Sequence, residues 1–113
     1  MSPITCHVLD TSLGQPARGL RVRLDVLDAN SAWQPVAERV TNDDGRVTDL
    51  MSPDTLGGHT YRITFSTGPY FAASGRPIFY PWVEVVFVVA SPAQHYHIPL
   101  LLNPFGYSTY RGT

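Results

Sequence analysis

Proline and glycine recur so closely along this chain that a long helix cannot form in it. Ten Pro and nine Gly are spread over 113 residues. Proline removes a backbone donor and glycine favours turns, so each of them ends or weakens a helix. Apolar residues still make up 43% of the chain, which is too many for a disordered protein. The sequence therefore predicts a folded protein built from short strands that are joined by turns.

The segment 20–27 shows the clearest strand pattern. Its even-numbered positions are apolar and its odd positions from 21 to 25 are charged, which is typical of an antiparallel strand with one buried face. Further strands are predicted over 4–10, 33–40, 61–66, 82–90, 96–102 and 106–111. Pro35 interrupts its segment, which places that strand at a sheet edge. Segment 82–90 is apolar on both faces apart from Glu84, so we expect it to be covered on both sides, with a partner subunit as one candidate cover.

The segment 67–75 is the one stretch that fits a helix. Thr67 can cap its start, the apolar residues 70–73 can fill it, and Gly75 can end it. Many short strands with one short helix are typical of a β-sandwich of this length. We therefore expect an all-β sandwich of seven to eight strands with one short helix near 67–75, in a single domain that spans residues 1–113.

Charge and composition exclude several classes of function. The formal net charge is −1, so the chain has no basic surface that would bind nucleic acid. All eight basic residues are Arg, and the absence of Lys rules out Schiff-base catalysis. Cys6 is the only cysteine, so no intramolecular disulfide can form. Because no signal peptide or apolar span is recognisable, we expect a cytoplasmic protein with no membrane partner.

Four features carry side chains that are suited to chemistry. His7 lies in the middle of the first predicted strand, and Arg46 follows an Asn-Asp-Asp-Gly turn. His95 and His97 lie two residues apart and therefore on one strand face. The fourth feature is the segment 107–113, which is polar but rich in Tyr. Imidazole can act as acid or base near neutral pH, and guanidinium makes planar contacts to polar groups.

Each of these features also has a structural interpretation. A single His in a strand or an Arg after a turn is most often a hydrogen-bonded or solvated residue, and a Tyr-rich segment often packs at an interface. His95 and His97, with His7 as a third ligand, fit a zinc site by spacing alone. A Cys6–His7 dyad is disfavoured because neighbours on a strand point to opposite faces. The residue types alone leave open a His/Arg catalytic site, a metal site and a structural role.

Longer strings of the sequence resemble one family over nearly the whole chain. They are His7–Asp10 with Gly14–Ala17, Asn42–Arg46, Phe79–Pro81 with Val85–Phe87, His95–Leu102 and Pro104–Gly112. On these strings the chain resembles the transthyretin-like 5-hydroxyisourate hydrolases. One departure is Thr113, where the family usually has Ser. Thr keeps the hydroxyl and adds a methyl group, which affects the fine geometry at that position.

The resemblance implies a fold, an assembly and a reaction. The fold is a transthyretin-like β-sandwich, and the assembly is a homotetramer, a dimer of dimers with active sites in clefts at the dimer–dimer interface. The reaction is hydrolysis of 5-hydroxyisourate to 2-oxo-4-hydroxy-4-carboxy-5-ureidoimidazoline in urate (purine) degradation, with no cofactor and no metal. The alternative is a transthyretin-like carrier of a small ligand that does no catalysis.

The resemblance also assigns roles to residues. Arg46 is expected to stabilise negative charge on the attacked carbonyl, while His7 and His97 position and deprotonate a water molecule. Substrate-binding roles fall to Tyr110, Arg111, Gly112 and Thr113. His95 ranks lower, and the sequence does not determine which His is the base. A carrier does not require this set of residues and transthyretin itself lacks it, so the set favours the enzyme.

Overall fold

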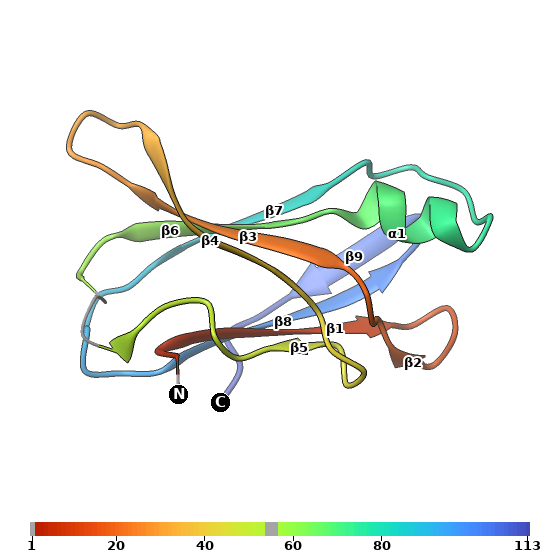
Figure 1. Ribbon diagram of the computed structural model, residues 1–113, viewed down its shortest axis with the longest axis horizontal. Coiled ribbons are helices and arrows are strands. Elements are labelled where there is room, and N and C mark those ends of the chain that lie inside the picture. Colours follow the sequence, from red (N-terminus) through yellow and green to blue (C-terminus); the bar gives the residue numbers. More distant parts are fainter. Residues whose placement is uncertain (1, 54–56) are drawn as a thin grey trace.

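Two β-sheets stack face to face in the computed structural model, which describes residues 2–53 and 57–113 (Figure 1). The first sheet contains β1 (Ile4–Asp10), β2 (Gln15–Pro16), β5 (Arg46–Val47), β8 (Tyr96–Asn103) and β9 (Gly106–Thr109). The second contains β3 (Arg21–Leu27), β4 (Trp33–Val40), β6 (Thr60–Phe65) and β7 (Val83–Val88). In the described residues a single helix, α1 (Thr67–Ala73), follows β6. The predicted all-β sandwich with one short helix is therefore confirmed.

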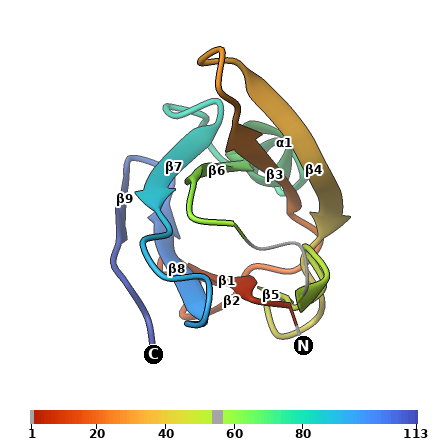
Figure 2. The same cartoon turned by 90° about the vertical axis from the view of Figure 1, so that its left-hand side faces the viewer.

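The first sheet is organised around β1. On one side β8 pairs with β1 in parallel over the whole length of β1. On the other side β5 pairs with Cys6 and His7, and β2 pairs with Leu9 and Asp10. Figure 2 shows β1, β5 and β8 side by side in one layer, facing β3 and β6 across the interior. β2 and β5 have two residues each, too few for a hydrophobic pattern to reveal, so nine strands are described where seven to eight were predicted.

The second sheet is antiparallel throughout, in the order β4-β3-β6-β7. β4 lies at its edge, as Pro35 predicted. Pro35 stands opposite Asp25, where the register between β3 and β4 shifts. A proline is tolerated there because an edge strand with a local irregularity does not need every backbone donor.

β7 has one face that the single chain leaves uncovered. Segment 82–90 was expected to be covered on both sides, with a partner subunit as one candidate cover, and in the single chain β7 is the other edge of this sheet with one face turned outward. Val86 and Val88 are 55% and 67% exposed, whereas Val83 is buried. In the isolated chain the strand is thus covered on one face only, because the second sheet packs on one side of it.

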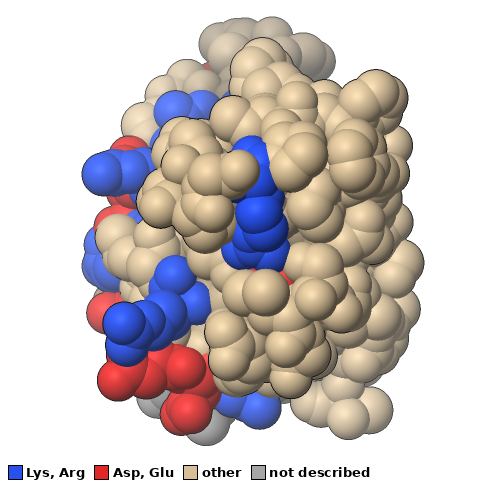
Figure 3. All heavy atoms as spheres, turned by 90° about the vertical axis from the view of Figure 1, so that its right-hand side faces the viewer, with Lys and Arg blue, Asp and Glu red and all other residues tan. Residues whose placement is uncertain are grey.

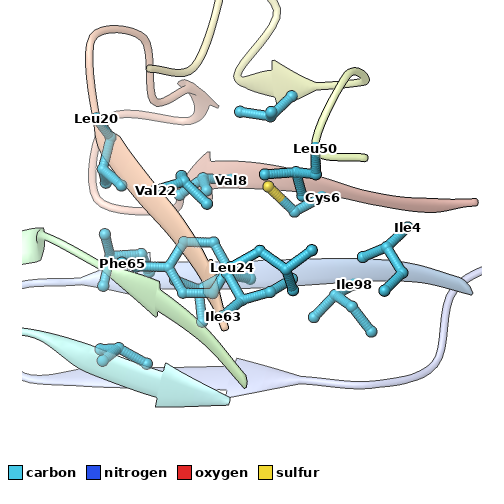
Figure 4. Close-up of a cluster of buried hydrophobic side chains, with 14 of the residues drawn as sticks. Ile4, Cys6, Val8, Leu20, Val22, Leu24, Leu50, Ile63, Phe65 and Ile98 are labelled. Carbon is cyan, nitrogen blue, oxygen red and sulfur yellow. The ribbon is translucent and has the colours of Figure 1, made fainter. Parts of the chain in front are cut away.

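The space between the sheets is filled by apolar side chains that alternate along the strands. Ile4, Cys6 and Val8 of β1 point inward, and they pack with side chains of β3, β6 and β8 (Figure 4). Phe65 and Leu24 are among the largest side chains that are fully buried. Each fully buried aliphatic or aromatic side chain contributes about 1.5–3 kcal/mol relative to an exposed one. This core fixes which side chains of β1 face outward.

The helix begins one residue earlier than the predicted cap implied. Thr67 was predicted to cap it, but Ser66 holds the N-cap position and makes no side-chain capping bond. The Thr67 hydroxyl instead donates to the backbone carbonyl of Tyr80, which ties the helix to the loop before β7. Gly75 follows the helix with a positive φ of 68°, a conformation that glycine adopts without strain. The predicted end of the helix is therefore confirmed and the predicted cap is wrong.

Charged side chains lie mostly on the surface and in pairs. Figure 3 shows Arg side chains beside Asp and Glu side chains on the face that it views, so that this face carries no extended region of one sign. Arg18 pairs with Asp43, and Arg21 pairs with Glu38. No helix in the described residues is long and apolar enough to cross a membrane.

Two carboxylates are buried in the described residues, Asp25 in β3, which pairs with Arg23 and Arg62, and Asp10 at the end of β1. Asp10 accepts hydrogen bonds from Tyr70 of α1 at 2.7 Å and from Ser12 at 2.7 Å, and it pairs with Arg76 at 2.8 Å. Burial alone would raise the pKa of Asp10, but these hydrogen bonds and the charge of Arg76 outweigh it and lower the pKa to about 2. The ionised Asp10 therefore fastens the end of β1 to the helix and to the segment after it.

Replacing Asp10 should destabilise the fold. The Asp10→Asn variant leaves Arg76 without its charged partner, and breaking a buried pair in this way costs on the order of 3 kcal/mol. Urea unfolding measures the change in the free energy of unfolding. The contribution of Asp10 is complete above its unfolded pKa near 4 and is lost as the pH falls through about 2, so the gap between wild type and variant should close in acid.

The matched control is Asp43→Asn. Asp43 pairs with Arg18 at 3.6 Å, but its side chain is 92% exposed. A pair exposed to this degree contributes about 0–1 kcal/mol, so Asp43→Asn should unfold almost like the wild type. Equal free energies of unfolding for the two variants would contradict the role given to Asp10.

Candidate active site

His7 reaches the outer face of the first sheet because β1 alternates. Cys6 and Val8 on either side of it are fully buried in the core, while His7 is half-buried on the opposite face. Burial raises the pKa of the Cys6 thiol to about 12, so Cys6 is an uncharged core residue at neutral pH. The predicted absence of a Cys6–His7 dyad is confirmed by this geometry.

Arg46 is brought to His7 by the turn that precedes it. The side chain of Asn42 accepts hydrogen bonds from the backbone N–H groups of Asp44 and Arg46, both at 2.9 Å, which closes the turn. Gly45 has a φ of 73°, and a side chain there would collide with the backbone carbonyl of Val8. Because Gly45 lets the turn approach β1 this closely, β5 pairs with β1 and places Arg46 directly opposite His7.

His97 arrives from β8, at the other side of β1. The parallel register puts His97 opposite Thr5, two residues before His7. The ring centroids of His7 and His97 are 6.3 Å apart. The ring centroids of His95 and His97 are 6.4 Å apart, in agreement with the prediction that these two imidazoles share a face. Three imidazoles therefore lie within one region of the outer face of the first sheet.

A small cleft of about 160 Å³ lies among these residues. Its lining residues come from β1, from β5 and the residue that follows it, from β8 and the residue that precedes it, and from the last residue of the chain. They are Thr5, Cys6, Arg46, Thr48, His95, His97 and Thr113. The cleft thus brings together Arg46, His97 and Thr113, and His7 lies at its border beside His97.

Arg46 differs from the other arginines in its surroundings. Six of the other seven form ion pairs with carboxylates, and Arg111 donates to the side-chain oxygen of Gln94. Within residues 2–53 and 57–113, no hydrogen bond or ion pair is found for the Arg46 guanidinium, which is exposed. A guanidinium without a partner beside two imidazoles is available for an anionic or strongly polar ligand.

The four residues after β9 lie in two different surroundings: some contact the cleft, and the others line a separate cavity. Gly112 forms an antiparallel bridge with His97, and its backbone N–H donates to the His97 carbonyl at 2.9 Å. Tyr110 and Arg111 instead line a separate cavity beside β7 and β8, where the Arg111 guanidinium stacks 4.7 Å from the centre of the Tyr96 ring. Of the four residues predicted to bind substrate, Gly112 and Thr113 lie at the cleft, and Tyr110 and Arg111 do not in the single chain.

Both imidazoles of the predicted site favour their neutral form. Burial lowers the pKa of His97, and the charges of Arg46, His7 and His95 lower it further. Burial also lowers the pKa of His7, and Arg46 adds to this effect, while a backbone hydrogen bond to Asp44 and the Asp44 charge oppose it. At neutral pH these groups therefore have free lone pairs, which is the state that a general base requires.

The zinc alternative finds little geometric support. In the part of the chain that the structure describes, no group of three or more His, Cys, Asp and Glu side chains is placed to hold one metal ion. His7, His95 and His97 share a surface, with ring centroids 6.3 Å apart for His7 and His97 and 6.4 Å apart for His95 and His97.

A larger groove elsewhere on the surface lacks comparable chemistry. It measures about 1040 Å³ and lies between α1 and the region of β2. Its cations are already neutralised, because Arg18 pairs with Asp43, Arg21 with Glu38, and Arg76 with the buried Asp10. The small cleft is the better candidate although it is much smaller, because it combines imidazoles of lowered pKa with an unpaired guanidinium.

The sequence did not single out Thr5 or Thr48 as site residues, and it ranked His95 below His97. All three line the cleft. The alternation of β1 puts Thr5 on the face of His7, which was a usable signal. The parallel pairing that sets Thr5 against His97 has no local signature, because it joins residues at opposite ends of the chain.

The chain was compared with known proteins. The model of the HIUase/Transthyretin family matches residues 4–112. A protein of Caenorhabditis elegans named probable 5-hydroxyisourate hydrolase is 49% identical over 111 residues, which cover 97% of this chain and 80% of that protein. The 5-hydroxyisourate hydrolase of Mus musculus is 45% identical over 113 residues, which cover 99% of this chain and 96% of the mouse protein.

Solved structures show the same fold. Sea bream transthyretin, in a complex with thyroxine, superimposes with a TM-score of 0.94 at 30% identity, covering 99% of this chain and 96% of that one. A structure of (S)-allantoin synthase superimposes with a TM-score of 0.89 at 38% identity, covering 97% of this chain and 43% of the other. The fold is therefore similar both to transthyretin and to (S)-allantoin synthase.

The charge of Arg46 should be detectable at both histidines. In the Arg46→Gln variant the cation is lost, so the pKa of His7 and the pKa of His97 should both rise. The measurement is the titration midpoint of each imidazole by NMR. His59 lies outside the cleft, and its signals should be unaffected, which makes it an internal control. Unchanged midpoints for both His7 and His97 would show that Arg46 does not face them.

A side chain at Gly112 should displace His97. A Cβ atom there would lie 2.7 Å from Cδ2 of the His97 ring and 3.1 Å from Cγ of Pro99. We expect Gly112→Ala to fold but to lose activity on the order of 10-fold or more, because the ring must move. The control is Gly106→Ala in β9, where a Cβ would meet only the Asn103 side chain, at 3.7 Å. Equal activity of the two variants would contradict contact between Gly112 and His97.

Proposed function

The chain belongs to the HIUase/transthyretin family, and on that premise we propose that it is a 5-hydroxyisourate hydrolase. The reaction adds water to a ring carbonyl of 5-hydroxyisourate and opens the C–N bond, giving 2-oxo-4-hydroxy-4-carboxy-5-ureidoimidazoline in the degradation of urate. The observation that carries the proposal is the meeting of Arg46 and His97 in one cleft, with His7 at its border. The named relatives are similar to this chain over nearly its full length.

Arg46 suits the part of the reaction in which charge develops. When water attacks a carbonyl, its oxygen becomes negative, and a fixed cation or donor beside it lowers the barrier. Arg46 has no carboxylate partner in the described residues, so its charge is not already neutralised. The substrate is a flat, polar and partly anionic ring, which the planar guanidinium can contact through two N–H groups.

The imidazoles suit the activation of water. A base must be neutral before it accepts a proton, and burial with the nearby Arg46 lowers the pKa of both His7 and His97. As water attacks, its oxygen bonds to the carbonyl carbon while its proton passes to an imidazole nitrogen. That proton can then move to the ring nitrogen that departs. The rate should therefore be retained at neutral pH and lost as the pH falls through the lowered pKa of the base.

The cleft in one chain is smaller than most ligand sites. Such sites typically measure about 300–1,000 Å³, whereas this cleft measures about 160 Å³. We propose that a second copy of the chain, in a homotetramer built as a dimer of dimers, completes the site over the outer face of the first sheet. In that assembly Tyr110 and Arg111 bind substrate or support the cleft, together with Gly112 and Thr113.

A carrier of a small ligand is the second candidate, because sea bream transthyretin has the same fold and was solved with thyroxine. A carrier needs a pocket of suitable shape, but it has no use for imidazoles held neutral beside an unpaired cation. The arrangement of Arg46, His7 and His97 therefore favours hydrolysis. A carrier would leave the spontaneous decay of 5-hydroxyisourate unchanged.

The decisive measurement is the decay of freshly made 5-hydroxyisourate, followed by ultraviolet absorbance. The wild type should accelerate the decay. The variants His97→Ala and Arg46→Ala should each lose about 10²- to 10⁴-fold in turnover, as is typical when one acid–base or charge-stabilising group is removed. Circular dichroism and size-exclusion chromatography should show that both variants keep the wild-type fold and assembly.

The control variant is Arg18→Ala. Arg18 is an exposed arginine that pairs with Asp43 at 3.6 Å, in the groove away from the cleft. It removes the same charge from the chain as Arg46→Ala, so it separates a local effect from a change in net charge. Near-normal turnover in both His97→Ala and Arg46→Ala would rule out this site.

A further inference from the structure

Thr5 joins two imidazoles through one hydroxyl group. Its Oγ1 atom lies 2.8 Å from Nδ1 of His97 and 3.1 Å from Nε2 of His95. Thr5 is only 4% exposed, so this hydroxyl has little access to water. Neither the roles given above to His7, Arg46 and His97 nor the names of the relatives assign a function to this bridge.

The hydroxyl restricts the protonation of both rings. A threonine hydroxyl carries one hydrogen to donate and can accept hydrogens on its oxygen. Between two neutral imidazoles it therefore donates to one ring and accepts from the other. If it accepts from His97, the hydrogen of His97 is on Nδ1 and the lone pair of that ring is on Nε2. If it donates to His97, the hydrogen is on Nε2 and the ring cannot act as a base from that atom.

The geometry favours the arrangement in which Thr5 accepts from His97. The bond to His97 is the shorter of the two, and Thr5 stands directly opposite His97 in the parallel ladder. In the described part of the chain, Nε2 of His97 has no hydrogen-bond partner, so it is the ring nitrogen left for a ligand of the cleft. A hydrogen on Nδ1 leaves the lone pair on Nε2, where the cleft can use it.

His95 is the second hydrogen-bond partner of the Thr5 hydroxyl. With Thr5 accepting from His97, the hydroxyl hydrogen must point elsewhere, and Nε2 of His95 at 3.1 Å is the acceptor that the structure provides. Thr5 is β-branched, which limits the rotation of its side chain, and it lies in a strand that is paired on both sides. The hydroxyl is therefore held in place by the strand, and its hydrogen is directed by His95.

We propose that Thr5 is a positioning residue, which together with His95 holds His97 with its hydrogen on Nδ1 and so makes Nε2 of His97 the base. The inference rests on the proposed hydrolysis, in which His97 activates water. The proton of the attacking water passes to Nε2, while the hydrogen on Nδ1 stays in its bond to Thr5. The proton on Nε2 then passes to the departing ring nitrogen, which returns His97 to its starting state. Thr5 and His95 neither gain nor lose a proton.

The test compares Thr5→Val with Thr5→Ser. Valine has the shape of threonine without the hydroxyl and suits a strand, whereas serine keeps the hydroxyl. We expect Thr5→Val to lower kcat by about 10²-fold with little change in KM, because the base is present but wrongly oriented or protonated. Thr5→Ser should recover most of the wild-type kcat. Equal activity of the valine and wild-type proteins overturns the proposal.

The second readout does not depend on activity. In ¹⁵N-labelled protein, NMR signals of the ring nitrogens distinguish a protonated nitrogen from an unprotonated one. His97 of the wild type should be protonated at Nδ1 and unprotonated at Nε2 when the ring is neutral. In Thr5→Val this preference should weaken, and in Thr5→Ser it should remain. A wild-type His97 that is protonated at Nε2 overturns the proposal.

The matched control is Thr64→Val in β6. The Thr64 hydroxyl is buried and has no hydrogen-bond partner in the described residues, so its loss removes no interaction and leaves the cleft untouched. This variant should keep the wild-type kcat and the wild-type state of His97. The two proposals fail separately: a wild type without hydrolase activity refutes the proposed function, whereas an active enzyme that is indifferent to the Thr5 hydroxyl refutes only the role of Thr5.

Discussion

The hydrogen-bonded ladder between β1 and β8 is the contact on which the rest of this structure depends. It pairs every residue of β1 in parallel with a residue of β8, and its register decides which side chains become neighbours. Thr5 stands against His97 because of that register. A shift of one residue would turn His97 toward the core and bring an apolar side chain to the cleft. The core side chains Ile4, Cys6 and Val8 prevent such a shift, because it would expose them to water.

The arginines of the protein have two kinds of surroundings, with a carboxylate partner and without one. Most arginines are paired with a carboxylate, and one such pair, Asp10 with Arg76, is buried where β1 ends. Arg46 and Arg111 are the exceptions, but Arg111 donates to the Gln94 side chain, whereas Arg46 has two imidazoles beside it and no hydrogen-bond partner in the described residues. The paired charges stabilise the fold. The Arg46 guanidinium instead lowers the pKa of His7 and the pKa of His97, and it remains available for a ligand. The candidate site is thus the place where charge is left unbalanced.

Much of the fold could be predicted from the sequence, because alternation and turn residues act locally. The strand at 4–10 and the edge position of β4 followed from side-chain periodicity and from Pro35. The two-residue strands β2 and β5 escaped prediction because pairing, and not composition, defines them. His7, Arg46 and His97 were singled out from their residue types and positions, and the resemblance of the strings around them supplied their expected roles. Thr5 was missed, because its importance comes from a partner more than ninety positions away along the chain.

The distance along the chain between Thr5 and His97 also bears on how the protein acquires its chemistry. The two residues are 92 positions apart, so their meeting closes a loop that contains most of the chain. Closure of such a loop has a large entropic cost that only the finished sandwich repays, and folds rich in such contacts form slowly. No early folding intermediate that lacks the β1–β8 ladder can contain the imidazole cluster. Nascent or partly folded chains are therefore inert, and the first appearance of the cleft in a refolding experiment marks the completion of the native topology.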